Sequence, residues 1–124
     1  MNVGSTAGFQ PGPHMAVYYA TKAYVYSFTE ALAEELKDTR ITITNLAPGA
    51  TDSEFKERAD MNGTVLFAMG AMSPEEVAKA GYKAMLRGKS LVIPGLKNKL
   101  IPVGANILPR KVMRKIVHRV NRDK

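Results

Sequence analysis

Apolar residues recur at intervals of three and four between about Met15 and Asp38, and this period predicts one long helix. The N-terminal half of that segment is almost wholly apolar or aromatic, so we expect more than one face of the helix to be buried. The next segment, 41–47, is rich in β-branched residues and predicts a strand that ends at Pro48-Gly49. A helix followed by a strand is therefore the first unit of the predicted fold.

Clear start and stop signals mark a second helix. Ser73 can cap this helix, Pro74 suits its first position, and Glu76 completes a capping box. The apolar pattern runs to about Leu86, and Gly88 can end the helix because glycine readily adopts the left-handed conformation that follows a helix.

The remaining segments continue the alternation of strands and helices. Residues 1–4 suggest the end of an extended segment, and 54–58 a short helical turn. Residues 90–93 predict a strand, 97–107 a helix, and 109–124 a final basic amphipathic helix. This order of elements predicts α/β units around a parallel sheet, in a chain that holds two strands and part of a third.

Composition places the chain among ordinary globular proteins. Its 124 residues are enough for one domain, and 45% of them are apolar. Cysteine is absent, which excludes disulfides and thiolate metal sites and suits a cytoplasmic protein. No apolar run is long enough for a transmembrane helix, and the N-terminus lacks the basic and apolar regions of a signal peptide. No group of His, Asp and Glu has metal-ligand spacing.

Positive charge is concentrated near the C-terminus. The net charge is +7, and residues 83–124 hold twelve Lys or Arg and one acid. We expect 109–122 to pack its apolar stripe on the body or on a subunit, with a solvated basic face; membrane-peripheral contact with anionic lipid is an alternative. Nucleic-acid binding is a weaker interpretation, because no aromatic residue follows Tyr82 to stack on bases. His14 and His118 are expected to be surface residues.

Three polar residues near the N-terminus could meet at one reacting carbonyl. Tyr18 and Lys22 are four residues apart on the predicted helix and so share a face. An ammonium beside a phenol favours the phenolate and lowers the pKa of the tyrosine, so Tyr18 becomes a usable proton donor or acceptor. Ser5, thirteen residues before Tyr18, could bind the same substrate oxygen.

Simpler interpretations exist for each of these residues. Ser5 could be a turn-capping serine, and Tyr18 with Lys22 could be a buried aromatic residue beside a solvated lysine. Tyr26 lies on the same helix face, but Glu30 follows it by one turn and would raise its pKa. Tyr26 is therefore a poorer candidate for proton transfer than Tyr18.

The motifs around these residues resemble those of the classical-type short-chain dehydrogenases/reductases. They are Asn2-Val3-Gly4-Ser5-Thr6-Ala7-Gly8, Tyr18-Tyr19-Ala20-Thr21-Lys22 and Leu46-Ala47-Pro48-Gly49-Ala50-Thr51. A bare Tyr-x-x-x-Lys occurs often by chance, whereas the three motifs in this order and spacing form a specific pattern. The resemblance implies the C-terminal half of that fold, with a partial Rossmann-like parallel sheet and flanking helices over 1–124.

The resemblance also implies the roles of individual residues. Tyr18 would exchange a proton with the substrate oxygen, Lys22 would lower the pKa of Tyr18 and bind the nicotinamide ribose, and Ser5 would polarise the carbonyl. The loop of Pro48, Gly49, Ala50 and Thr51 would lie against the nicotinamide of NAD or NADP. Residues 52–72 would form the substrate loop, whose apolar content suggests a small apolar alcohol or carbonyl substrate. The helix that carries Tyr18 would pack against its counterpart in a homo-oligomer.

One part of the family pattern is absent. The Gly-rich turn that cradles the pyrophosphate of a dinucleotide does not occur, and Gly4-x-x-x-Gly8 has the wrong spacing for it. The expected function is an NAD(P)-dependent oxidoreductase. The alternatives are a truncated, non-catalytic remnant or split-gene half, and a membrane-surface protein that uses its basic helix.

Overall fold

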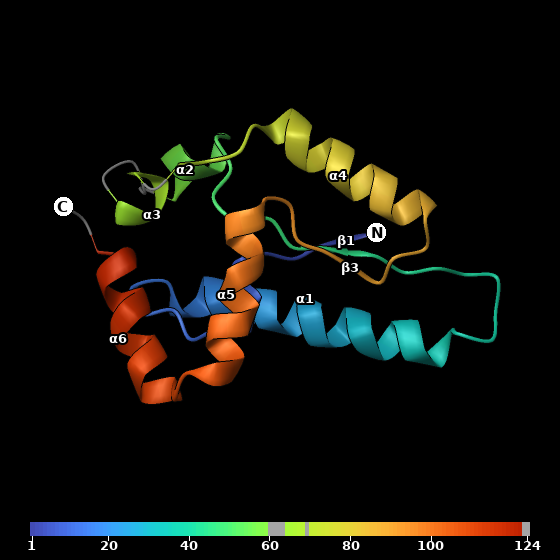
Figure 1. The fold of residues 1–124 in the computed structure, drawn as a ribbon, viewed down its shortest axis with the longest axis horizontal. Coiled ribbons are helices and arrows are strands. Elements are labelled where there is room, and N and C mark those ends of the chain that lie inside the picture. The colour runs from blue at the N-terminus through green and yellow to red at the C-terminus, as the bar shows by residue number, and fades with distance from the viewer. Residues whose placement is uncertain (60–63, 69, 123–124) are drawn as a thin grey trace.

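The computed structural model describes residues 1–59, 64–68 and 70–122 (Figure 1). In chain order the described elements are β1 (Asn2–Val3), the 3-10 turn η1 (Thr6–Phe9), α1 (Ala16–Glu35), β2 (Asn45–Leu46), α2 (Phe55–Arg58), α3 (Val65–Ala68), α4 (Pro74–Leu86), β3 (Leu91–Val92), α5 (Leu96–Ile107) and α6 (Arg110–Val120). The helices and strands alternate as the sequence predicts.

The three strands form a parallel sheet in the order β1-β2-β3. Helix α1 contacts β1 and β2, whereas α4 contacts β3. Figure 1 shows the sheet between α1 and α4, so helices cover both of its faces. This arrangement confirms the predicted α/β class with a partial Rossmann-like sheet, because parallel strands joined by helical crossovers bury both sheet faces.

Strand β2 is shorter than the predicted strand 41–47. Its ladder begins where Thr44 accepts a hydrogen bond from the Asn2 amide at 2.8 Å and where Asn45 donates one to Ser90 at 2.8 Å. Ile41 precedes the paired part of β2, where neither β1 nor β3 runs alongside, and it is 59% exposed. A β-branched composition therefore predicts the strand, whereas the length of the ladder depends on where its neighbours run alongside.

The expectation that α1 buries more than one face is wrong for this chain. Only Tyr19 and Thr29 are buried on this helix. Val17 is 78% exposed, Tyr24 67% and Phe28 45%, and the Tyr24 and Phe28 rings stack with centroids 5.8 Å apart. One side of α1 packs on the sheet and η1, and an apolar side remains open because no described element covers it.

The start and stop of α4 agree with the sequence prediction. Ser73 accepts a hydrogen bond from the Glu76 amide at 3.2 Å, and the Glu76 carboxylate accepts one from the Ser73 amide at 3.2 Å. These bonds satisfy amides that the first turn of a helix leaves unpaired. Gly88 has φ 64 just after the helix, which is the conformation that favours glycine there.

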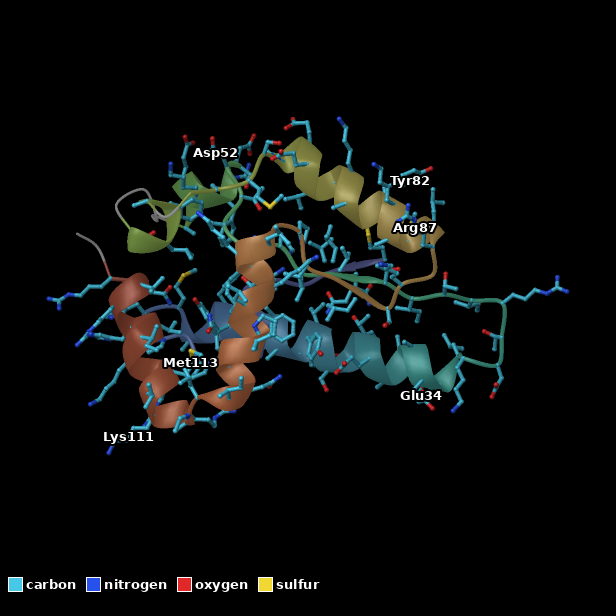
Figure 2. The ribbon with its side chains drawn as sticks, viewed as in Figure 1. Glu34, Asp52, Tyr82, Arg87, Lys111 and Met113 are labelled. Carbon is cyan, nitrogen blue, oxygen red and sulfur yellow. The ribbon has the colours of Figure 1, made fainter. Side chains whose placement is uncertain are left out.

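The apolar stripe of α6 packs on the body of the molecule. Met113 and Val117 are 6% and 3% exposed and form a core cluster with Ala7 and Tyr19. In Figure 2, Met113 lies on the side of α6 toward α5, whereas Lys111 extends outward. This confirms the expected packing of the predicted basic helix 109–124, of which 123–124 lie outside the described residues.

The predicted substrate loop, 52–72, is closed at its base. The Asp52 amide donates a hydrogen bond to the Met72 carbonyl at 2.9 Å, and the Met72 amide donates one to the Ala50 carbonyl at 3.0 Å. The two ends of the loop therefore pair with each other. The loop carries α2, in agreement with the predicted helical turn at 54–58, and it also carries α3. Residues 60–63 and 69 of this loop lie outside the described part of the chain.

Candidate active site

Ser5 lies between the end of β1 and the start of η1. Its Oγ accepts a hydrogen bond from the Ala7 amide at 3.1 Å, so Ser5 caps the 3-10 turn as the simpler interpretation supposes. The same hydroxyl donates to the Pro48 carbonyl at 3.3 Å. Ser5 is therefore both a structural cap and the residue that links the first strand to the Pro48-Gly49 loop.

Tyr18 and Lys22 lie one turn apart near the start of α1. The Lys22 Nζ is 5.6 Å from the centroid of the Tyr18 ring, within the range of a cation–π contact. It also donates to the Val3 carbonyl at 3.1 Å, at the end of β1. Burial lowers the pKa of Lys22 from its ordinary value, because desolvation disfavours the charged ammonium. The sheet thus holds the ammonium beside the tyrosine.

The Tyr18 ring is fixed by aromatic neighbours. Its centroid is 5.1 Å from that of Phe55, with an interplanar angle of 32°, and 6.1 Å from that of Tyr19, with an angle of 76°. The Tyr18 hydroxyl makes no hydrogen bond with any described residue. A fixed ring with an unengaged hydroxyl suits a group that must meet a substrate oxygen.

The Pro48-Gly49 loop is held from three sides. The Pro48 carbonyl accepts from the Thr6 amide at 2.9 Å and from Ser5. Thr51 Oγ1 donates to the Gly49 carbonyl at 3.1 Å. A Cβ on Gly49 would lie 2.4 Å from the Asn98 side chain, so the loop approaches α5 more closely than a larger residue would permit.

The predicted site residues line one large cleft of about 980 Å³. The cleft runs across the carboxyl ends of β1 and β2, where open α/β sheets bind ligands. The predicted site residues that line it are Ser5, Tyr18, Lys22, Pro48, Gly49, Ala50 and Thr51. Most of the other lining side chains are apolar, and they include Phe55, Leu66 and Phe67 from the predicted substrate loop. The structure thus brings together every candidate residue, while their catalytic and binding roles stay predictions.

Two neighbouring tyrosines, Tyr19 and Tyr26, have raised pKa values and are therefore poor proton donors near neutral pH. Tyr26 donates a hydrogen bond to Glu30 at 2.9 Å, and burial together with this carboxylate raises the pKa of Tyr26 to about 12. Burial also raises the pKa of Tyr19, which donates to Asn121 at 3.1 Å. The predicted effect of Glu30 on Tyr26 is confirmed.

Some contacts around the site have no signal in the sequence. Asn98 donates to the Pro94 carbonyl at 2.7 Å and packs beneath the Pro48-Gly49 loop. His14 and His118 are exposed, as expected, but their ring nitrogens lie 3.0 Å apart. Asn98 and Gly49, like His14 and His118, lie far apart in the sequence, the two histidines by 104 residues. No motif indicates that either pair meets.

The described residues show neither a candidate metal site nor a membrane-spanning helix. They contain no group of three or more His, Asp or Glu side chains that could hold a metal ion. None of their helices combines the length and the apolar character needed to cross a membrane.

The fold and the cleft define a Rossmann-like α/β protein, and similarity to known proteins identifies its family. A family profile described as short chain dehydrogenase matches residues 1–63. The NADP-dependent 3-hydroxy acid dehydrogenase of Schizosaccharomyces pombe is 35% identical over 101 residues, which cover 75% of this chain and 38% of that protein. A sulfoacetaldehyde reductase of Chromohalobacter salexigens is 46% identical over 55 residues, or 44% of this chain and 22% of that protein.

A solved structure agrees with these sequence matches. It is a short-chain dehydrogenase from Sphingobium yanoikuyae in complex with NADPH, with a TM-score of 0.68 and 32% identity, covering 77% of this chain and 36% of that one. The protein therefore belongs to the short-chain dehydrogenase/reductase family. The chain spans between 22% and 38% of the length of the curated relatives described above.

The described residues fit one end of a nicotinamide cofactor. The Lys22 ammonium has three N–H donors. One of them binds the Val3 carbonyl, so two remain for ribose hydroxyls. The backbone of Pro48–Thr51 is fixed at the rim of the same cleft and can face a planar ring. The Gly-rich turn that would hold the pyrophosphate is absent from the sequence, so the fit is limited to the nicotinamide and its ribose.

Proposed function

We propose that this chain carries the proton-transfer and nicotinamide-binding part of an NAD(P)-dependent oxidoreductase that acts on an alcohol or a carbonyl. One observation supports the proposal most strongly: Ser5, Tyr18 and Lys22 open into a single apolar cleft together with the Pro48-Gly49 loop. Membership of the family and the NADPH complex of the structural neighbour support the same cofactor class.

Each polar residue has a distinct role in this proposal. In the direction of reduction, the Tyr18 hydroxyl gives its proton to the oxygen of the carbonyl as that oxygen gains negative charge. The Lys22 ammonium favours the tyrosinate that remains, because opposite charges attract strongly where water is scarce. The Ser5 hydroxyl accepts from the Ala7 amide, and by turning its single hydrogen from the Pro48 carbonyl to the substrate it can donate a second hydrogen bond to the same oxygen.

The cleft fixes what kind of substrate can reach these groups. When bound, a nicotinamide cofactor supplies or accepts the hydride. Phe55, Leu66 and Phe67 present apolar surface on the side of the substrate loop, and the Phe55 ring lies 5.1 Å from the Tyr18 ring, centroid to centroid. We therefore expect small apolar aldehydes, ketones or alcohols to bind better than charged ones.

The proposal is tested by turnover of NADPH with a panel of apolar aldehydes and ketones. Tyr18→Phe should lower kcat at least about a hundredfold, since general acid catalysis contributes typically 10²–10⁴ in rate. Tyr26→Phe is the matched control, because it removes a hydroxyl from the same helix outside the cleft and should leave turnover unchanged. Unchanged turnover in Tyr18→Phe would remove Tyr18 from this role. A folded chain without turnover would favour the non-catalytic alternative.

We also propose that α1 pairs with a second copy of the chain. Val17, Tyr24 and Phe28 leave apolar surface exposed on this helix, and burial of such surface favours association. Light scattering should give a mass above that of one chain, and Tyr24→Glu should shift the mass toward the monomer. A monomer at every concentration would contradict the pairing without affecting the catalytic proposal.

A further inference from the structure

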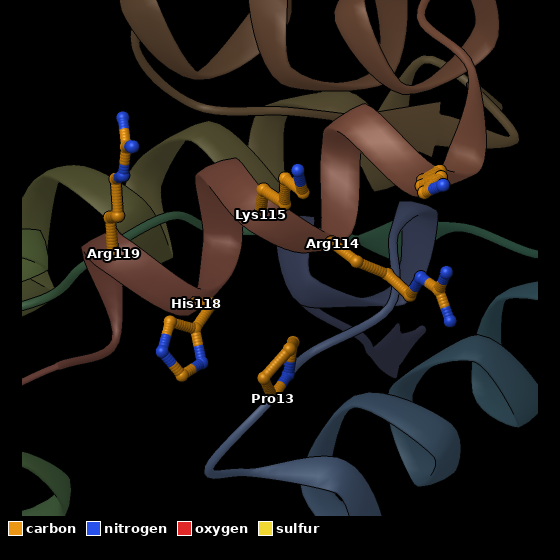
Figure 3. Close-up of a pocket in the computed structure, with 6 residues that line it drawn as sticks. Pro13, Arg114, Lys115, His118 and Arg119 are labelled. Carbon is orange, nitrogen blue, oxygen red and sulfur yellow. The ribbon is translucent and has the colours of Figure 1, made fainter.

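A basic pocket lies between the solvent-facing side of α6 and the loop before α1 (Figure 3). Its volume is about 510 Å³. The lining residues are Pro13, Lys111, Arg114, Lys115, His118 and Arg119. Apart from Pro13, every lining residue is a Lys, Arg or His. None of them lines the cleft of the candidate active site, so the basic pocket is a separate feature.

The cationic groups are arranged along one helix face. Lys111, Arg114 and His118 are three or four residues apart, so they follow one another along α6. Figure 3 shows Arg114 and His118 on either side of Pro13, which closes the pocket from the loop before α1. Lys115 and Arg119 leave the helix on its neighbouring side and add positive charge.

No described carboxylate neutralises this charge. The ion pairs within residues 1–59, 64–68 and 70–122 are Lys37–Glu34 and Arg58–Glu54, and both lie on other elements. Uncompensated cations gathered on one face attract anions and raise their local concentration. The planar fork of Arg114 additionally matches two oxygens of one phosphate group.

Two hydrogen bonds of Asn121 fix the wall of the pocket formed by Pro13. The Pro13 carbonyl accepts from Asn121 Nδ2 at 3.0 Å, while Asn121 Oδ1 accepts from the Tyr19 hydroxyl at 3.1 Å. Gly12 packs on the Tyr19 ring so closely that an added Cβ would lie 2.1 Å from it. The loop and α6 are therefore held together before any ligand binds, and this lowers the entropic cost of binding.

His14 holds the same loop in a strained conformation. Its φ of 70 lies in the left-handed region, which is unfavourable for residues other than glycine. The His14 Nε2 lies 3.0 Å from His118 Nδ1, so the strained residue is tied to the rim of the basic pocket. Strain of this kind often marks a functional position, because the surrounding structure must offset its cost.

We propose that the basic pocket binds a phosphate group carrying two or more negative charges, such as a phosphate monoester or a diphosphate. The pocket is open to solvent, and its cluster of cationic side chains suits a small group of high negative charge. Lys111 and Arg114 supply the main contacts, and His118, held by His14, supplies a further N–H donor. This site is independent of the proposed oxidoreductase function.

Calorimetric titration with inorganic pyrophosphate tests the proposal directly. Saturable binding is expected, and Lys111→Gln/Arg114→Gln should weaken it about tenfold or more, since each exposed charge pair contributes up to roughly a factor of five. Lys79→Gln/Lys83→Gln on α4 is the matched control, because it removes the same charge elsewhere and should change binding less than about twofold. Neither pair makes a hydrogen bond or ion pair with a described residue, so the fold should survive both changes.

Co-sedimentation with vesicles distinguishes the source of the phosphate. Binding of pyrophosphate alone indicates a soluble ligand, whereas binding only to vesicles with phosphatidic acid, lost in the pocket variant, indicates a lipid headgroup. His14→Gly relieves the backbone strain and removes the imidazole, so it should raise stability while weakening binding. Equal weakening in the pocket and α4 variants, or no saturable binding to either probe, would overturn the proposal.

Discussion

Replacement of Asn121 by Ala should destabilise the protein more than its place near the C-terminus suggests. Asn121 is 6% exposed and joins two distant parts of the chain through Tyr19 and the Pro13 carbonyl. Without it, the buried Tyr19 hydroxyl loses its partner, which costs about 1–3 kcal/mol. The Pro13 carbonyl is only half-buried, so water can replace part of its lost bond, at about 0.5–1 kcal/mol. The expected loss in the free energy of unfolding is therefore about 1.5–4 kcal/mol.

Urea denaturation followed by circular dichroism measures this loss. With a slope of about 1.5 kcal/mol per M, the midpoint should fall by about 1–2.7 M. Tyr19→Phe in the native background should cost about 1 kcal/mol, and it should cost much less once Asn121→Ala is present, because the shared hydrogen bond is already lost. A loss below about 0.5 kcal/mol for Asn121→Ala, or equal costs for Tyr19→Phe in both backgrounds, would refute the reasoning.

Two further predictions concern other hydrogen bonds. The folded state raises the pKa of Tyr26 from 10.0 to about 12, so it favours the neutral phenol; this contribution to stability is complete below about pH 10 and is lost as pH rises through 12. Tyr26→Phe should therefore make the alkaline loss of stability less steep and remove the highest tyrosinate transition in an absorbance titration; an unchanged titration would contradict the assigned effect of Glu30. Ser73→Ala should lower the free energy of unfolding by about 1 kcal/mol in thermal melts, because it removes the N-cap hydroxyl that accepts a hydrogen bond from the Glu76 amide. Ser27→Ala, at an exposed position of α1, is the control.

Local patterns in the sequence predict much of the fold. The capping box at Ser73 and the glycine at Gly88 act within a single turn, so the α4 boundaries follow from neighbouring residues. Tyr18 and Lys22 meet because four residues on a helix make one turn. The parallel order of the strands follows from their alternation with helices.

Other features depend on contacts between distant segments. The length of β2 is set by where β1 and β3 run beside it, which the composition of 41–47 does not show. The exposure of Val17 depends on which elements lie next to α1, and an apolar pattern indicates only that a face can be buried. The His14–His118 contact arises from the packing of α6 on the loop before α1, 104 residues away.

A titration of NADPH into the purified chain, followed by the fluorescence of the cofactor, tests the central claim most directly. If the described cleft holds the nicotinamide and its ribose, binding should be saturable. Lys22→Met should weaken it at least about tenfold, since a hydrogen bond from a charged group contributes roughly 1.5–3 kcal/mol. Lys37→Met makes the same change of charge just beyond the C-terminal end of α1 and should leave binding intact. Absence of saturable binding up to millimolar NADPH, or equal binding by the two variants, would contradict the assignment of this cleft as the cofactor site.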